Sequence, residues 1–450
     1  MTVFDEIKRM IEKKEFSKAK KILERMEDDA EKYNTLGIIC YYEGNIDEAS
    51  NYFRKALELN PVHDDALFNY SKVLFEKGLH FESWRYLTRI NRKTWEIFDM
   101  LGDTQLRQNN LAMALHYYHK AVELSNLSEM KNKYETLKNQ LKKALRLAIF
   151  CLPRLDNFIK DIVSVLSEIY EVEVVVTTDG RQIADAYNRA DIVWIEWANE
   201  MAIYITNNFP KNDKKVICRL HSYEALGNYP EKINWTNVDT VVLVADHIES
   251  ILKAYHENVY KKIREKIKII PNGVNLNRFK YTIHSPGFNI AVVANINYKK
   301  APEMWLQVIG MLKKIDERYT LHVAGGFQDL RYLHYFKYLI DDAGLRKNVR
   351  LYGFVKNVNE FLEDKNYLLS TSIHESFGYN IAEAMARGIK PIIHNYAGSK
   401  KQWPKELVYN YIHEIPRILN QEYSSDEYRK HIELNYSLEK QIKTIYSILI

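Results

Sequence analysis

Two glutamates, eight residues apart, lie in a segment whose residue types suit the binding of phosphate and of hydroxyl-rich ligands. Glu375 precedes a small-residue loop, and Glu383 lies inside the helix expected to follow it. The free backbone N–H groups of Ser376, Phe377 and Gly378, at the start of that helix, attract phosphate. Carboxylates accept hydrogen bonds from pairs of sugar hydroxyls. The two glutamates need not meet, so they could grip different parts of one ligand.

Further candidate residues stand at the ends of other predicted strands. Lys299 and Lys300 follow the run 290–293, where a point charge suits phosphate; solvated lysines at a helix start are the alternative. His221 follows the run 216–220, so it is expected to point into a cleft, although a lone histidine is often only a packing residue. Glu196 and Trp197 end a third strand and could line an acceptor site. Open α/β sheets bind ligands at such strand ends.

Glycines after the run 321–324 would let the backbone approach a ligand closely. Gly325 and Gly326 carry no Cβ, so the chain could pass near a bound nucleotide at this point. A plain turn explains the same pair equally well.

The elements that must position these residues follow from two alternations of apolar runs and helical patterns. Such an alternation predicts a parallel sheet with crossover helices. Pro271-Asn272-Gly273 separates the two, so the chain is expected to form two Rossmann-like α/β domains with a ligand-binding cleft between their strand ends. The predicted strands are 146–152, 172–176, 192–195, 216–220 and 241–244, then 290–293, 321–324, 349–352, 367–370 and 391–393.

The N-terminal third of the sequence shows a repeating helical pattern instead of alternating strands and helices. A set of seven positions resembles the tetratricopeptide repeat signature: Tyr33, Leu36, Gly37, Ala49, Phe53, Ala56 and Pro61. Weaker copies occupy 67–90 and 98–121, and residues 11–23 read as a degenerate capping hairpin. Small residues such as Gly37 are needed because the paired helices cross closely. A repeat array of this kind presents surfaces to proteins or peptides.

The expected organisation has five parts. They are a tetratricopeptide repeat domain (1–128), a linker helix (129–145), a first Rossmann-like domain (146–275), a second Rossmann-like domain (276–432) and a C-terminal helix (433–450) that could pack back on the first Rossmann-like domain.

From about Arg146 onward the sequence resembles the retaining glycosyltransferases of family 4, which have the GT-B architecture of two facing Rossmann-like domains. The likeness rests on the glutamate pair 375 and 383, on Pro271-Asn272-Gly273-Val274, on Ala384-Met385-Ala386-Arg387-Gly388 and on His221. Bacterial proteins in which tetratricopeptide repeats precede such a transferase are the most similar in organisation. The fold expected is therefore α/β GT-B behind an all-α repeat array.

The resemblance implies a role for each candidate residue. Glu375 would hold donor-sugar hydroxyls, Glu383 the nucleotide ribose, Lys300 or Lys299 the diphosphate, and His221 the sugar or its phosphate. The main chain around Val355 would read the base. The arginine that the family tends to carry shortly before the lysine is absent here, where Ala294-Asn295-Ile296-Asn297 stands instead.

The activity implied is the transfer of a hexose from a nucleotide diphosphate sugar to an acceptor, with retention of configuration. In the mechanism proposed for the family, the leaving phosphate takes the acceptor proton, so no protein nucleophile is expected. The acceptor could be a protein recruited by the repeats or a glycan, and no metal or other cofactor is expected. The alternative is a catalytically inactive GT-B fold that acts as a repeat-mediated binding or scaffold protein.

Composition excludes several other classes. The formal net charge of +5 over 450 residues is too weak for a nucleic-acid-binding surface. Three scattered cysteines form no metal-ligand spacing and suit a reducing compartment, and no run approaches the length of a membrane span. We therefore expect a cytoplasmic protein. Six basic residues within 253–268 are better explained by a solvated helix face than by weak contact with a membrane surface.

Overall fold

The structure is a computed structural model that describes residues 3–143 and 145–449. The chain divides into two compact units. The repeat unit contains the described residues up to Leu141 together with Leu276–Ile283, and the α/β unit contains Lys142–Asn275 and the chain from His284 onward.

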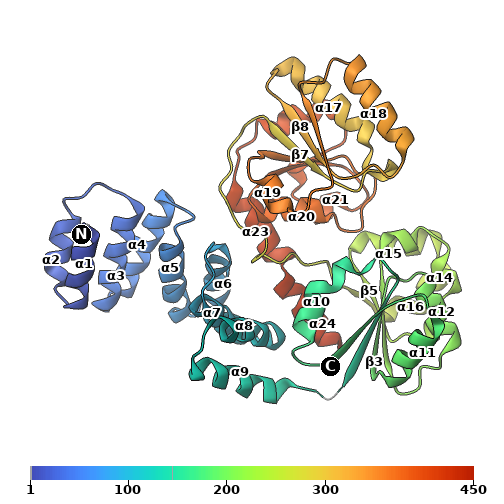
Figure 1. Ribbon diagram of the computed structural model, residues 1–450, viewed down its shortest axis with the longest axis horizontal. Coiled ribbons are helices and arrows are strands. Elements are labelled where there is room, and N and C mark those ends of the chain that lie inside the picture. The colour runs from blue at the N-terminus through green and yellow to red at the C-terminus, as the bar shows by residue number, and fades with distance from the viewer. Residues whose placement is uncertain (1–2, 144, 450) are drawn as a thin grey trace. The chain divides into compact units, whose positions relative to one another are not determined.

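Helices α1 to α9 of the repeat unit pack pair by pair along the chain (Figure 1). Short turns join the helices of each pair, and Gly44 and Gly78 adopt positive φ values of 82° and 77° in two of them. The helices are α1 (Val3–Glu12), α2 (Phe16–Leu23), α3 (Ala30–Tyr42), α4 (Ile46–Leu59), α5 (Asp64–Glu76), α6 (His80–Arg89), α7 (Trp95–Arg107), α8 (Leu111–Leu124) and α9 (Ser128–Leu141).

Close crossing of paired helices explains the small residues of the repeats. A Cβ atom placed on Gly37 in α3 would lie 2.6 Å from the ring of Phe53 in α4. The third repeat has the same arrangement, where a Cβ on Gly102 would lie 2.4 Å from the ring of Tyr118. The prediction that these positions tolerate only small side chains is confirmed at Gly37.

The first sheet of the α/β unit is six-stranded and parallel, with the order β2-β1-β3-β4-β5-β6. Its strands are β1 (Arg146–Cys151), β2 (Glu171–Val176), β3 (Ile192–Glu196), β4 (Lys215–Leu220), β5 (Thr240–Leu243) and β6 (Ile267–Ile269). Its helices are α10 (Lys160–Leu166), α11 (Gly180–Arg189), α12 (Glu200–Asn208), α13 (Ser222–Ala225), α14 (Tyr229–Lys232), α15 (Asp246–Tyr255) and α16 (Glu257–Ile263).

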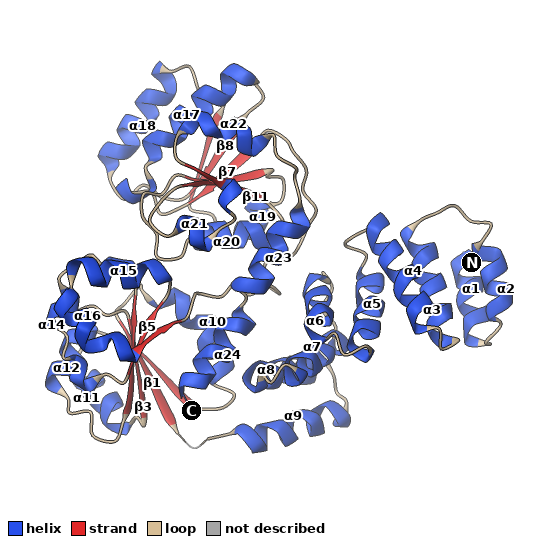
Figure 2. Cartoon of the chain, turned by 180° about the vertical axis from the view of Figure 1, so that it is seen from behind, coloured by secondary structure: helices blue, strands red, loops and turns tan. Residues whose placement is uncertain are grey.

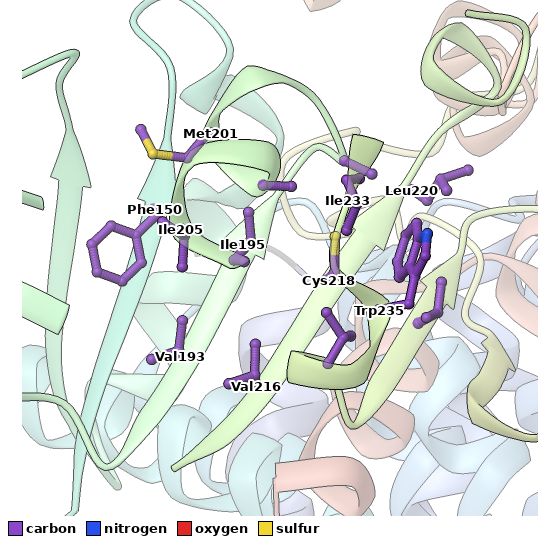
Figure 3. Packing of buried hydrophobic residues seen from close by; sticks show 14 of the residues in the cluster. Phe150, Val193, Ile195, Met201, Ile205, Val216, Cys218, Leu220, Ile233 and Trp235 are labelled. Atoms are coloured by element: carbon purple, nitrogen blue, oxygen red, sulfur yellow. The ribbon is translucent and has the colours of Figure 1, made fainter. Parts of the chain in front are cut away.

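The core of this sheet explains why its strands read as continuous apolar runs. Every residue of β3 is buried, because helices cover both faces of a parallel sheet (Figure 2). On one face, side chains from neighbouring strands pack against α12 (Figure 3). The residues shown include Phe150, Val193, Ile195, Val216, Cys218 and Leu220 from the strands and Met201 and Ile205 from α12.

The second sheet is also six-stranded and parallel, with the order β12-β11-β10-β7-β8-β9. Its strands are β7 (Asn289–Val293), β8 (Thr320–Ala324), β9 (Val349–Gly353), β10 (Tyr367–Ser370), β11 (Lys390–His394) and β12 (Val408–Tyr409). Its helices are α17 (Pro302–Ile315), α18 (Leu330–Asp342), α19 (Val358–Leu362), α20 (Tyr379–Ala386), α21 (Ser399–Gln402) and α22 (Ile415–Leu419).

The last two helices, α23 (Ser425–Asn435) and α24 (Leu438–Leu449), complete the α/β unit. Helix α24 contacts α10 beside the first sheet. The Gln441 side chain accepts a hydrogen bond of 3.0 Å from the backbone of Gly273. The C-terminal helix is therefore tied to the junction between the two sheets.

Several bounds and elements differ from the expected ones. Helix α9 ends at Leu141 instead of continuing to 145, and Ala144 lies outside the described residues. Residues 276–283, assigned from sequence to the second α/β domain, belong to the compact repeat unit. Strands β6 and β12 were not predicted, because they are only three and two residues long and carry little apolar pattern.

Candidate functional site

The order of the strands in the second sheet reverses between β7 and β10. These two parallel strands are neighbours, although β8 and β9 lie between them in the sequence. Crevices at such a switch point are where open α/β sheets bind ligands. The loop after β7 carries Lys300 and the loop after β10 carries Glu375, and their side chains form an ion pair. The Ser372 hydroxyl also donates to Glu375, at 2.7 Å. The sheet order thus joins two residues that the sequence singled out separately.

The loop around Lys300 is held by local hydrogen bonds. The Asn297 side chain accepts from the backbone N–H of Lys299 at 3.1 Å, and the Lys299 carbonyl accepts from Ile373 at 2.9 Å. Ala301 then adopts a left-handed φ of 42° before Pro302 begins α17. A non-glycine residue in this region stores backbone strain, which clusters at functional sites. The Lys299 side chain is half-buried on the same loop.

The small-residue loop after Glu375 presents its backbone at the start of α20. Gly378 caps this helix with a φ of 86°, a value that favours glycine. The Phe377 ring is buried against Tyr436 and Trp403, with ring centroids 5.2 and 5.9 Å away. Phe377 can therefore offer a ligand only its main chain. Glu383 lies half-buried within α20.

At the first sheet, the carboxyl ends of β3 and β4 carry a buried cluster of polar side chains. Glu196 accepts from Arg219 at 3.0 Å and from the indole N–H of Trp194 at 2.9 Å. Its carboxylate also accepts from Nε2 of His221, at 3.3 Å. Trp197 stacks on the His221 ring with centroids 3.9 Å apart and has a left-handed φ of 74°.

This burial changes the interpretation of Glu196. Its side chain is 0% exposed, so it does not line an acceptor site as the sequence suggested. Its partners instead make it a residue that positions His221, which is itself only 2% exposed. Trp197 is half-buried above that ring and remains the acceptor-side candidate of the pair.

Burial and neighbouring charges set the protonation of this cluster. Burial by itself would raise the pKa of Glu196, but Arg219 and the hydrogen bond from His221 outweigh it and lower that pKa to about 2. Burial lowers the pKa of His221, and the charge of Arg219 adds to this effect. Glu196 is therefore an anion and His221 a neutral imidazole at neutral pH.

Hydrogen bonds connect the strand-end loops of the two sheets within the α/β unit. The hydroxyl groups of Ser222 and Ser376 lie 2.5 Å apart, and His374 Nε2 lies 2.7 Å from the same Ser222 hydroxyl. His247 Nε2 donates to the carbonyl of Glu375 at 2.9 Å. Sequence reasoning missed Ser222 and the two histidines, as it missed Arg219. Ser222 is adjacent to His221 and His374 is adjacent to Glu375, which was the available signal for those two residues; His247 carried no such signal.

An aromatic contact adds to these hydrogen bonds. Phe158, after β1, stacks on Tyr379 at the start of α20 with centroids 5.1 Å apart. The indole of Trp197 packs edge-on against Phe158 at 5.9 Å. Residues from the switch point of the first sheet therefore reach the helix start that the sequence assigned to phosphate.

Gly325 has a reason to be glycine that does not involve a ligand. Its φ is 141°, and a Cβ atom there would lie 1.7 Å from the carbonyl oxygen of Ala294. The close approach predicted from sequence is thus to the neighbouring loop of the same sheet. Val355 is half-buried in the loop after β9, and the Gly325 N–H donates to Gly353 in that strand at 2.7 Å.

Residues 3–143 and 145–449 contain no group of three or more His, Cys, Asp or Glu side chains arranged to hold a metal ion. None of the helices described there is long and apolar enough to span a membrane.

Comparison with known families identifies two modules. Residues 274–441 match the family model of glycosyl transferases group 1, and residues 30–61 match a tetratricopeptide repeat. The latter match confirms the first repeat, which the structure builds from α3 and α4. The chain is also 26% identical over 133 residues to stress-induced-phosphoprotein 1 of Caenorhabditis elegans, a match that covers 27% of this chain and 42% of that protein.

Solved structures resemble the fold of the α/β unit. A glycosyltransferase from Rickettsia africae has a TM-score of 0.54 at 16% identity, covering 68% of this chain and 98% of its own. HepE of Anabaena in complex with UDP has a TM-score of 0.55 at 14% identity, covering 68% of this chain and 99% of its own. The fold of the α/β unit is therefore GT-B, and residues 274–441 within it are similar to glycosyl transferases group 1.

Proposed function

We propose that the α/β unit transfers a hexose from a nucleotide diphosphate sugar to an acceptor with retention of configuration. In this proposal Glu375 holds hydroxyls of the donor sugar and Glu383 holds the nucleotide ribose. Lys300 carries the diphosphate, assisted by Lys299 and by the backbone of residues 376–378. The main chain near Val355 contacts the base. No metal ion is required.

The ion pair between Lys300 and Glu375 carries this proposal. Both side chains are mostly buried at the switch point of the second sheet, with 18% and 15% of their surface exposed. A donor would supply a diphosphate to the cation and hydroxyl groups to the carboxylate, so each charge would exchange its present partner for one on the ligand. A pair of this kind keeps both charges compensated until the ligand arrives.

The chemistry needs stabilisation of the negative charge that develops on the leaving diphosphate. Lys300 and the N-terminal turn of α20 supply it, because the first N–H groups of a helix have no partner within the helix. The leaving phosphate takes the proton of the acceptor hydroxyl, so no protein base is used. His221 is neutral and only 2% exposed, so its proposed role is to keep the hydrogen bond to Glu196 and to support the stacked ring of Trp197.

The acceptor proposed is a protein or glycan, with the repeats available to recruit a protein partner. Helices α5 and α7 line a groove of about 670 Å³ in the repeat unit. Its aromatic side chains, Phe68, Phe75 and Trp95, lie among five acidic and two basic residues. A peptide with apolar and basic side chains fits that lining.

The second candidate is a GT-B fold without activity that serves as a scaffold. The loop 294–297, which carries no cation where the resemblance leads one to expect arginine, favours it. Calorimetric titration of the full chain with a set of nucleotide sugars, in excess EDTA, separates the candidates. We expect one nucleotide sugar to bind without metal. We also expect Glu375→Gln to lower the rate of transfer by several orders of magnitude.

Glu317→Gln is the matched control, because Glu317 is exposed on the loop before β8. Its transfer rate is expected to equal that of the wild type. Failure of every nucleotide sugar to bind would support the scaffold. Binding that requires added magnesium or manganese would disprove the metal-free part of the proposal.

A further inference from the structure

The chain that connects the two sheets passes through the repeat unit. It leaves the α/β unit after Asn275 and returns at His284, and the eight residues between them, Leu276–Ile283, cluster with the repeats. We call these eight residues the interdomain linker. Loops usually connect neighbouring elements directly over the surface, so a connection that joins another compact unit needs a physical reason.

Both ends of the interdomain linker are fixed within the α/β unit. Before it, the backbone N–H of Val274 donates to the carbonyl of Tyr436 at 2.8 Å. After it, the backbone N–H of His284 donates to the hydroxyl of Ser425 at 2.9 Å. The linker is therefore a short segment between two residues, Val274 and His284, that are hydrogen-bonded within the α/β unit. The contacts of the linker itself determine the path of the chain between them.

Within the repeat unit the linker contacts α6 and α8. The Asn277 amide donates to the hydroxyl of Tyr117, in α8, at 3.1 Å. The guanidinium of Arg89, in α6, lies 4.9 Å from the centroid of the Tyr281 ring and 5.7 Å from that of Tyr86. Cation–π contacts of this kind strengthen when they are removed from water.

Burial separates the linker into two sets of side chains. Leu276, Phe279 and Tyr281 are 0%, 6% and 2% exposed, whereas Arg278 and Lys280 between them are exposed. Arg89 and Tyr117, which receive the linker, are 6% and 2% exposed. A free, solvated connection would show no such division, so the linker binds as a peptide binds its receptor.

We infer that α6 and α8 form a binding surface whose occupant is the interdomain linker of the same chain. The repeats thereby fix the path of the connection between the two sheets. This surface is distinct from the groove between α5 and α7, which other helices line. The inference does not depend on the transfer activity.

Hydrogen–deuterium exchange of the full chain tests the inference, with limited trypsin digestion beside it. Tyr281→Ala and Arg89→Ala each remove one partner of the buried cation–π contact. We expect amide exchange in 276–283 to rise at least tenfold in both variants, and trypsin to cut after Arg278 or Lys280. Exchange in β7 and β10 should stay at the wild-type rate.

Tyr42→Ala is the matched control, since Tyr42 lies in α3 with 63% of its surface exposed. It should leave the exchange of the linker unchanged. If Tyr281→Ala does not fold, Tyr117→Phe serves in its place, because it removes only the hydroxyl that accepts a hydrogen bond from Asn277. This variant is expected to raise amide exchange in the linker about threefold. Unchanged exchange in the folded variants, or an unprotected linker in the wild type, would overturn the inference.

Discussion

Lys299 and Lys300 are adjacent in the chain, but the fold gives them different partners. Lys300 pairs with Glu375 in a mostly buried position, whereas the side chain of Lys299 lies half-buried on the loop. Charged hydrogen bonds are worth about 1.5–3 kcal/mol, roughly a 10- to 100-fold change in binding. We therefore expect Lys300→Met to weaken donor binding by that factor.

Lys299→Met provides the comparison for Lys300→Met, because it removes the same charge one residue away. Lys299→Met should weaken donor binding less than about threefold if the contact between Lys300 and the diphosphate supplies most of the binding energy. Calorimetry with the donor found for the wild type measures both variants. Equal losses in the two variants would show that the loop supplies a general positive field instead of a specific contact.

The protonation of His322 links the stability of the second sheet to pH. It is buried in β8, where its Nδ1 accepts from the hydroxyl of Tyr352 at 2.8 Å and its Nε2 donates to Asn289 at 3.3 Å. Burial, assisted by the charge of Lys365, lowers its pKa to about 4. Both hydrogen bonds suit a neutral ring, which has one donor and one acceptor.

The sign of the pH effect follows from this pKa. An unfolded chain protonates His322 near pH 6.5, so between about pH 6.5 and 4 the unfolded state binds more protons. Stability from this residue is thus complete above pH 6.5 and falls by up to about 1.4 kcal/mol per pH unit below it. Urea unfolding at pH 7.5 and 5 should show a smaller pH effect in His322→Gln than in the wild type. His334→Gln, at an exposed site in α18, should keep the wild-type dependence.

At the scale of single elements, two helical glycines respond in opposite directions to the same substitution. An alanine in mid-helix is favoured over glycine by about 0.5–1 kcal/mol. Gly310, in α17, has no atom within 4 Å of an added Cβ, so Gly310→Ala should raise stability by that amount. Gly37→Ala would place a methyl group 2.6 Å from Phe53, and overpacking costs about 1–3 kcal/mol.

Thermal unfolding of the two alanine variants checks this difference. Gly37→Ala should lower the melting temperature of the repeat unit, and Gly310→Ala should raise that of the α/β unit. A stabilised Gly37→Ala variant would show that α3 and α4 can separate without loss. In that event the close crossing would not be the reason for glycine in the repeat signature.

At the scale of the whole molecule, removal of the repeats is expected to destabilise the rest of the chain. A chain lacking residues 1–127 keeps all the candidate site residues but loses the helices that the interdomain linker contacts. Phe279 and Tyr281, buried at 6% and 2%, would then face water. We expect the truncated chain to unfold at a lower temperature and to aggregate, because exposed aromatic surface associates.

A second truncated chain carrying Phe279→Ser and Tyr281→Ser tests that explanation. The polar side chains remove the exposed aromatic surface, so this chain should stay monomeric at concentrations where the first one aggregates. Light scattering during a thermal ramp compares them. Identical aggregation of both would show that the linker is not the cause, and the repeats would then contribute to solubility in another way.

The sequence by itself determined the architecture. Ten of the strands follow from short apolar runs. The inner strands are buried on both faces and have no polar side, whereas the edge strands β2 and β9 are mostly exposed. The repeat signature predicted the paired helices, and strand-end positions marked Glu375, Lys300 and His221 as candidate site residues. These patterns are local, since each depends on residues within one element and its immediate turn.

The tertiary structure alone decided which of these residues meet. Lys300 and Glu375 are 75 residues apart, and they pair because the sheet order makes β7 and β10 neighbours. Glu196 ends a strand as acceptor-side residues would, yet Arg219 and His221 converge on it and bury it. The interdomain linker joins the repeats for the same reason: burial is settled by contacts distant in the chain, which no local pattern records.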